Sequence, residues 1–204
     1  MSLPPDVSAD EALERLIAGN ERFLEGKARS RGVLRETLAE LTLGQHPIAT
    51  ILGCSDSRVP PEGIFDAGLG ELFVVRVAGN VLSPEVAGSL QYAGAHLGTP
   101  LLVVLGHEGC GAIQAALATK DEGVRQHSRI QLLVDSILPG LAELDPRLPP
   151  QERLAQAVET NVRRTVRAIL ESPEGQARLA EGRMKAVGAI YRIATGRVRF
   201  LADK

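Results

Sequence analysis

The chain has 204 residues, of which 44% are hydrophobic and 24% are charged, and its formal net charge is −2. This composition is typical of a globular protein with a sizeable core and excludes disordered and fibrous classes. The slight negative charge predicts no nucleic-acid partner, and no membrane partner is expected because no apolar run approaches the roughly 20 residues of a membrane-spanning helix.

The N-terminal part of the chain is expected to be helical. Residues 8–25 carry apolar side chains at helical spacing, and Ser8 and Glu11 have the spacing of a capping box. A second, shorter helix is expected over 33–43, where leucines recur at helical intervals. We assign 1–43 to an N-terminal helical arm.

From residue 44 onward, short apolar segments alternate with helical ones. The apolar segments are rich in β-branched residues, as buried parallel strands are; they lie at 48–53, 71–77 and 101–106. The expected helices lie at 84–97, 111–119, 124–138 and 151–171, with a proline-rich loop at 139–150. The tail 185–201 predicts a β-hairpin that turns at Thr195 and Gly196.

This alternation predicts the fold class. Strands that alternate with helices form an α/β domain with a mainly parallel central sheet flanked by helices. We therefore expect one domain over 1–204, in which the arm precedes an α/β core at 44–204.

Chemically active residues follow two of the expected strands. Cys54 follows 48–53 in GCSDSR, and His107 and Cys110 follow 101–106 in GHEGCGA. Ligands collect beyond the carboxyl ends of parallel strands, so these residues can converge there. Two thiolates and an imidazole form a good zinc set that leaves the fourth tetrahedral position free.

Taken alone, these residues leave other interpretations open. A cysteine near a strand end is usually a small buried hydrophobic residue, and His-x-x-Cys is a weak metal signal. The two cysteines could also form a redox pair, although neither lies in Cys-x-x-Cys. The glycines of GHEGCGA fit neither a dinucleotide fingerprint nor a phosphate-binding loop. The remaining histidines are interpreted as surface or structural residues: His46, His96 and His127.

Asp56 and Arg58 lie two residues apart, close to Cys54. An arginine can hold a carboxylate through two parallel hydrogen bonds, and a carboxylate held in this way can orient a water molecule at a metal. Without the neighbouring cysteine, such a pair is more often an ordinary surface ion pair.

Together, Cys-x-Asp-x-Arg at 54–58 and His-x-x-Cys at 107–110 resemble the motifs of the bacterial β-class carbonic anhydrases. The resemblance covers most of the chain and is weakest between about 120 and 180; it is carried by 12–26, 46–82, 88–117 and 187–200.

The resemblance implies a zinc enzyme, with one Zn²⁺ per chain, that interconverts carbon dioxide and bicarbonate. It implies zinc ligation by Cys54, His107 and Cys110, and a catalytic dyad of Asp56 and Arg58. The implied substrate contacts are Gln45, Phe73 and Gly111.

The resemblance further implies a homodimer or higher homo-oligomer whose N-terminal helices cover the partner. This arrangement would give the apolar stripe of 8–25 a place to pack. With two cysteines and no leader resembling an export signal, we expect the cytoplasm as the compartment.

Asp56 has two alternative positions, which distinguish an open from a closed zinc site. It can pair with Arg58, or it can become the fourth zinc ligand. Family members that close the site carry a tryptophan three residues before the first cysteine, where this chain has Ile51. We therefore expect an open site. Two rival functions remain: a noncatalytic protein with a closed structural zinc, and a hydrolase of carbon disulfide or carbonyl sulfide.

Overall fold

The fold is built on a five-stranded sheet with the order β2-β1-β3-β4-β5. The computed structural model describes residues 7–29 and 35–202. The strands are β1 (Ala49–Gly53), β2 (Leu72–Arg76), β3 (Leu101–His107), β4 (Lys185–Arg192) and β5 (Arg197–Phe200). Neighbouring strands from β2 to β4 are parallel, and β5 pairs antiparallel with β4. The mainly parallel sheet and the terminal hairpin are therefore confirmed.

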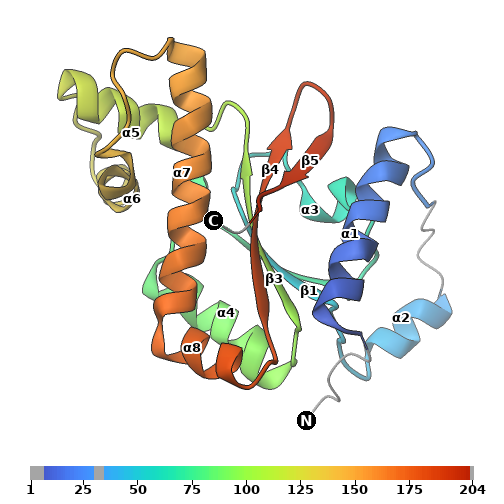
Figure 1. Ribbon diagram of the computed structural model, residues 1–204. Coiled ribbons are helices and arrows are strands. Elements are labelled where there is room, and N and C mark those ends of the chain that lie inside the picture. The colour runs from blue at the N-terminus through green and yellow to red at the C-terminus, as the bar shows by residue number, and fades with distance from the viewer. Residues whose placement is uncertain (1–6, 30–34, 203–204) are drawn as a thin grey trace.

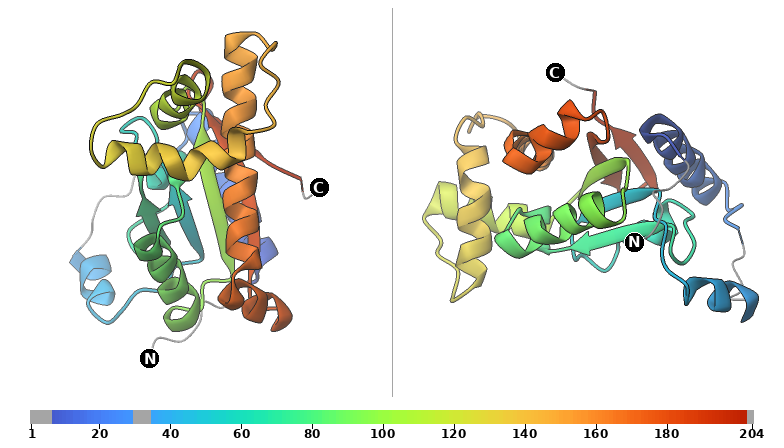
Figure 2. Two further views of the ribbon diagram at one scale, coloured as in Figure 1. Left: turned by 90° about the vertical axis from the view of Figure 1, so that its left-hand side faces the viewer. Right: turned by 90° about the horizontal axis from the view of Figure 1, so that it is seen from below.

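The sheet lies between two layers of helices (Figure 1). On one side are α4 (Pro84–His96), α5 (Gly111–Glu122), α6 (Ile130–Ile137), α7 (Pro150–Glu171) and α8 (Pro173–Ala180). On the other side are α1 (Ala9–Leu24) and α3 (Pro61–Ile64). The short helix α2 (Arg35–Leu41) lies at the margin of the molecule, away from the sheet (Figure 2).

Alternating residues of the buried strands build two separate cores. Leu52 and Val104 face the layer of α4 to α7, whereas Ile51 and Val103 face α1 and α3. Successive side chains on a strand point to opposite faces, so each continuous apolar strand supplies both cores. This burial on both faces explains why the sequences of the strands are continuous apolar runs.

Several element boundaries differ from the sequence expectation. Strand β3 includes His107, which pairs with Tyr191 of β4, so His107 ends the strand and does not follow it. Helix α5 continues beyond 119 until Gly123, whose φ of 69° suits glycine at a helix end. Helix α6 is shorter than 124–138, and α3 and α8 were not expected.

The two expectations at 33–43 and 139–150 are met in part. Helix α2 covers Arg35–Leu41, while residues 33 and 34 lie outside the described residues. The expected loop contains a short 3₁₀ helix, η2 (Leu138–Leu141), at its start.

Helix α1 begins with the capping box that the sequence predicts. The Ser8 hydroxyl accepts from the Glu11 N–H, and the Glu11 carboxylate accepts from the Ser8 N–H at 2.8 Å. The apolar stripe of this helix packs on its own chain, where Ala12 and Leu16 are fully buried against the sheet. The expectation that a partner subunit is needed to cover this stripe is wrong, because β3, β5 and α3 of the same chain already cover it.

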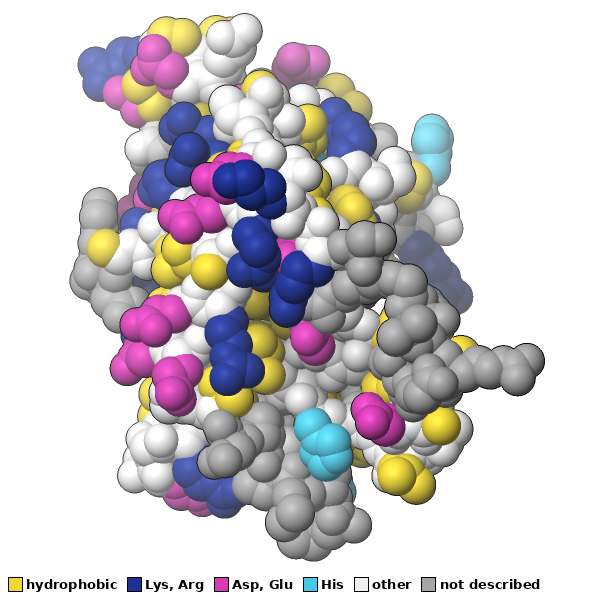
Figure 3. All heavy atoms as spheres, turned by 90° about the vertical axis from the view of Figure 1, so that its right-hand side faces the viewer, with side chains coloured by type: hydrophobic (Ala, Val, Ile, Leu, Met, Phe, Trp, Pro, Cys, Tyr) yellow, Lys and Arg dark blue, Asp and Glu magenta, His cyan; other side chains and the backbone are white. Residues whose placement is uncertain are grey.

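Charged side chains also fasten α1 to the core. Basic and acidic side chains lie next to one another on the face that carries α1 (Figure 3). Arg22 contacts Asp66 at 2.6 Å, and Lys185 of β4 contacts Asp10 at 2.7 Å.

Among residues 7–29 and 35–202, no helix combines the length and the hydropathy that crossing a membrane demands.

Candidate active site

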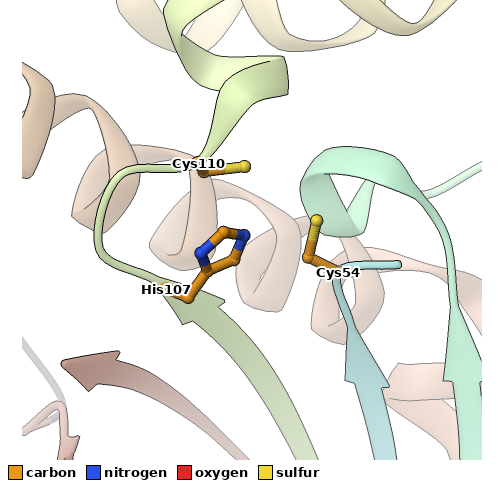
Figure 4. A group of neighbouring side chains, drawn as sticks. All are labelled: Cys54, His107 and Cys110. Atoms are coloured by element: carbon orange, nitrogen blue, oxygen red, sulfur yellow. The ribbon is translucent and has the colours of Figure 1, made fainter. Parts of the chain in front are cut away.

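Cys54, His107 and Cys110 point toward one another at the carboxyl ends of the central strands (Figure 4). Their candidate ligand atoms all lie within 4.8 Å of one another, and all three residues are buried. Cys54 directly follows β1, His107 ends β3, and Cys110 is the N-cap of α5. Because β1 and β3 are adjacent parallel strands, their carboxyl ends bring the two motifs together.

The orientation of His107 leaves one ring nitrogen free for a metal. Its Nδ1 lies 3.0 Å from the carbonyl oxygen of Glu108. A carbonyl can only accept, so Nδ1 carries the proton and Nε2 presents a lone pair. Nε2 is buried and has no hydrogen-bond partner among the described residues. An orphaned acceptor of this kind, oriented by a backbone carbonyl, is the usual arrangement of a metal-binding histidine.

The two thiols share one proton. The pKa of Cys54 is lowered to about 4, chiefly because the Cys110 S–H donates to it, and the pKa of Cys110 is raised well above its usual range because that hydrogen bond and burial hold its proton. Neither cysteine forms a disulfide. Burial lowers the pKa of His107, but the neighbouring Cys54 thiolate outweighs it, so the pKa is raised overall. A thiolate beside a second thiol and an imidazole fits a soft divalent cation, which would displace the remaining protons.

Asp56 and Arg58 form the expected bidentate pair next to this cluster. Arg58 Nε donates to Asp56 Oδ1 at 2.9 Å, and Arg58 Nη2 donates to Oδ2 at 2.7 Å. These hydrogen bonds hold the pKa of Asp56 well below its usual range. Asp56 Oδ2 lies 3.9 Å from His107 Nε2, so the pair borders the space between the metal-ligating atoms.

Comparisons with known proteins agree with this geometry. The family model described as carbonic anhydrase matches residues 49–198. Carbonic anhydrase 2 of Mycobacterium tuberculosis is 38% identical over 194 residues, which cover 95% of this chain and 93% of that protein. A solved β-carbonic anhydrase, CcaA, is 28% identical with a TM-score of 0.73, over 94% of this chain and 92% of that one.

The chain belongs to the β-class carbonic anhydrase family. The structures of two tetrameric β-carbonic anhydrases from the ascomycete Sordaria macrospora are also similar, at 25% identity and a TM-score of 0.76. That match covers 94% of this chain and 97% of the solved one.

Arg76 contacts the backbone of the candidate site, and the sequence analysis missed it. It ends β2, and its Nε and Nη2 donate to the carbonyl oxygens of Cys54 and Asp56, at 3.0 and 2.6 Å. These two bonds hold the loop that runs from Cys54 to the Asp56–Arg58 pair. The available signal was a basic residue near the carboxyl end of the apolar segment 71–77.

Gly111 lies beside the cluster as the first residue of α5. The first N–H groups of a helix have no partner within the helix and carry a partial positive charge. The position next to Cys110 therefore places a backbone donor where a negatively charged oxygen of a substrate could bind.

Gln45 does not lie at the metal cluster of its own chain. It precedes β1, whereas Cys54 follows it, and the residues Ala49–Gly53 between them span roughly 16 Å at about 3.3 Å per residue. Gln45 is exposed and lines a surface groove together with Tyr92 and Leu97.

Phe73 lies on the same side of the molecule as this groove. In the register of β1 and β2 it pairs with Thr50, near the amino end of β1, while Arg76 pairs with Gly53 at the carboxyl end. The Phe73 ring packs against Tyr92, with 6.1 Å between centroids. Sequence reasoning missed Tyr92, which is 47% exposed on α4 and links Phe73 to the groove of Gln45.

Proposed function

We propose that this chain catalyses the reversible hydration of carbon dioxide to bicarbonate and a proton, with one zinc ion held by Cys54, His107 and Cys110. The observation that carries the proposal is this buried ligand cluster with a bidentate Asp56–Arg58 pair at its border. Zinc in such a site would supply a nucleophile at neutral pH by lowering the pKa of its water to near 7.

Asp56 serves as an oriented acceptor in this proposal. Both of its oxygens are held by Arg58, so the carboxylate can direct the proton of the attacking water while its own position stays fixed. The same two hydrogen bonds oppose rotation of Asp56 onto the metal. We therefore propose an open site, with the fourth metal position left for water and substrate.

The substrate contacts follow from the surroundings of the cluster. The N–H of Gly111 at the start of α5 would donate to the oxygen that becomes negatively charged. Gln45 and Phe73 lie too far along the sheet to reach the metal of their own chain, as the register of β1 and β2 indicates. We propose that they complete the site of a second copy in a homodimer or larger homo-oligomer.

An edge of the sheet supports this assembly. Strand β2 is the terminal strand of the sheet, so no other strand in the described part of the chain pairs with its outer edge. Its side chains Leu72–Val75 are only partly buried, and Tyr92 and Leu43 are exposed. An apolar, open strand edge of this kind is a template for pairing with a partner. The Sordaria macrospora proteins of the same fold are tetrameric.

The compartment that we propose is the cytoplasm. The mechanism needs two reduced thiolates, and both cysteines are free. Thiols persist in the reducing cytoplasm, whereas oxidising compartments favour disulfides.

A rate measurement on three substrates tests the reaction. The zinc-loaded full chain is expected to hydrate carbon dioxide far faster than buffer alone and to act much more slowly on carbonyl sulfide and carbon disulfide. Hydration at the buffer rate would leave only a structural zinc. A higher rate on either sulfur compound would assign the chain to the hydrolases of that substrate.

A further inference from the structure

A buried chain of hydrogen bonds leads from the middle of α7 to the first metal ligand. The Asn161 side chain is 3% exposed, and its Nδ2 donates to the carbonyl oxygen of Gly79 at 2.9 Å. The N–H of the same glycine donates to Cys54 Sγ, with an N–S distance of 3.4 Å. One residue thus connects a helix on the outer layer with a sulfur of the metal cluster.

The backbone of Gly79 is held in an unusual conformation at this point. Gly79 lies in η1 (Ala78–Asn80) with φ 69° and ψ 15°, a left-handed conformation that favours glycine. An added Cβ would lie 3.0 Å from Ile137 Cδ1 and 3.1 Å from Ala112 Cβ. Helices α5 and α6 therefore confine the glycine sterically, and its N–H is directed at the sulfur.

The N–H and the carbonyl of Gly79 belong to successive peptide planes that meet at its Cα, so a bond that holds the carbonyl restrains the backbone rotations that would turn the N–H away from the sulfur. A hydrogen bond from an N–H to a thiolate is charge-assisted and stronger than one between neutral groups. It weakens when the N–H turns away from the sulfur, because hydrogen bonds are sensitive to angle. The Asn161 amide fixes the carbonyl of the same residue and so limits that rotation.

We propose that Asn161 is a positioning residue of the metal centre, which keeps the Gly79 N–H donating to the Cys54 thiolate and thereby slows zinc loss. The inference rests on the proposed zinc ligation by Cys54, and it is independent of which substrate the enzyme hydrates. Residues that orient metal ligands change metal affinity about 10- to 100-fold when they are removed.

Asn161→Ala and Asn20→Ala form a matched pair for the test. Asn20 on α1 is also buried, at 4%, and also donates to backbone carbonyls, those of Ile64 at 3.2 Å and Gly196 at 2.9 Å. Among the described residues, Asn20 hydrogen-bonds to Ile64, Gly196 and Val198, which lie outside the Cys54–His107–Cys110 cluster. Loss of either side chain removes a buried helix-to-backbone link, but only Asn161 is connected to Cys54.

The first measurement is the rate at which a chelator removes zinc from the full-length, zinc-loaded proteins. Asn161→Ala is expected to lose zinc about tenfold faster than wild type, and Asn20→Ala within about twofold of wild type. The sulfur-to-metal absorption band of the cobalt-substituted protein is expected to shift in Asn161→Ala alone. Equal zinc loss in the two variants would overturn the proposal.

A second measurement needs no variant and covers the case in which Asn161→Ala does not fold. In the ¹¹³Cd-substituted wild type, scalar coupling is expected between the metal and the Gly79 amide proton, through Cys54 Sγ. The Ala112 and Ile113 amides, which donate to Cys110, are internal controls. Coupling to these amides without coupling to Gly79 would overturn the proposal. If the wild type binds no metal, the proposed zinc site itself is wrong. If it binds zinc but does not hydrate carbon dioxide, only the proposed reaction is wrong.

Discussion

The side chain of Asp56 shows how one residue can decide between an open and a closed metal site. Both of its oxygens accept from Arg58, and Oδ2 also lies 3.9 Å from His107 Nε2 of the candidate metal cluster. The arginine offsets the attraction of the carboxylate to a nearby cation, because a bidentate pair satisfies both oxygens. In the proposed mechanism, the Asp56–Arg58 pair acts through the orientation of the carboxylate and needs no direct bond to the metal.

Removal of this arginine is expected to separate metal binding from turnover. Arg58→Ala should retain most of its zinc and lose at least about tenfold in hydration rate, because a freely rotating Asp56 no longer orients the attacking water. Zinc content by metal analysis and the rate by stopped-flow measurement test this expectation together.

The chain contains a matched control for this substitution. Asp145 and Arg147 form the same pair at the same spacing, with Nε–Oδ1 of 3.0 Å and Nη2–Oδ2 of 2.9 Å, and Arg147 is exposed. Arg147→Ala is expected to leave the rate unchanged. An unchanged rate in Arg58→Ala as well would reduce the catalytic pair to a surface ion pair.

Sequence reasoning located the residues of the candidate metal cluster and missed those that hold the surrounding backbone in place. Cys54, His107 and Cys110 were predictable because strand ends of a parallel sheet converge and because thiolates and imidazole are zinc ligands. Arg76 and Asn161 act by donating to backbone carbonyls, and such contacts leave no motif in the sequence.

At the scale of elements, α1 is an integral part of its own chain's core. Leu16 is 2% exposed, and Leu16→Ala is expected to lower the free energy of unfolding by about 2–5 kcal/mol because it leaves a cavity. Ile17→Ala is the control, since Ile17 lies next to Leu16 on the same helix and is 40% exposed. Urea unfolding measures both. Equal losses in the two variants would contradict the observed packing of α1.

The contact between α1 and Asp66 is expected to make stability depend on pH. Burial raises the pKa of Asp66, but hydrogen bonds from Arg22 and Arg29 outweigh it, so the pKa is lowered overall. A carboxyl whose pKa is lower in the folded than in the unfolded state stabilises the folded state. This stability is fully present above the pKa of the unfolded state, about 3.9, and is lost as the pH falls through the pKa of the folded state.

Asp66→Asn isolates this contribution. Asparagine keeps the shape and tolerates the φ of 47° at this position. The variant should be less stable than wild type at pH 7, and the difference should narrow below about pH 3.9. The measurement is the free energy of unfolding at pH 7 and at pH 3. A difference that stays constant between the two would show that ionised Asp66 contributes no stability.

The strands and the long helices were predictable, whereas the short helices α3 and α8 were not. The apolar pattern of the long helices extends over several turns, and that of the strands extends over several residues. Helix α3 covers only Pro61–Ile64 and starts at a proline, so its sequence resembles that of a loop. Helix α6 begins after Ser128, whose φ of 54° breaks the helical run that the sequence suggested over 124–138.

At the scale of the whole molecule, the α/β class and the parallel sheet followed from the alternation of strands and helices. The expectation of an oligomer came from the family resemblance, and the apolar stripe of α1 adds no support to it because that stripe packs on its own chain. The open edge of β2 and the separation of Gln45 from Cys54 now support it. Periodicity shows that a face is apolar, but it cannot show which chain covers that face.

Complementation between two inactive variants tests whether the sites are shared between copies. Cys54→Ser should lose zinc, because a neutral hydroxyl is a poor substitute for a thiolate, and Gln45→Ala should keep zinc and turn over slowly. In a mixed dimer, the intact Cys54 of one chain meets the intact Gln45 of the other. We expect co-expressed chains to regain activity. No recovery in verified mixed dimers would show that Gln45 acts, if at all, within its own chain.

Stepwise addition of zinc to the metal-free protein tests the central claim most directly. Three protein ligands from one chain predict that the hydration rate rises linearly up to one zinc per chain and then stays constant. Full activity before any zinc is added, or none once one equivalent is bound, would contradict the assignment of this chain as a zinc-dependent carbon dioxide hydratase.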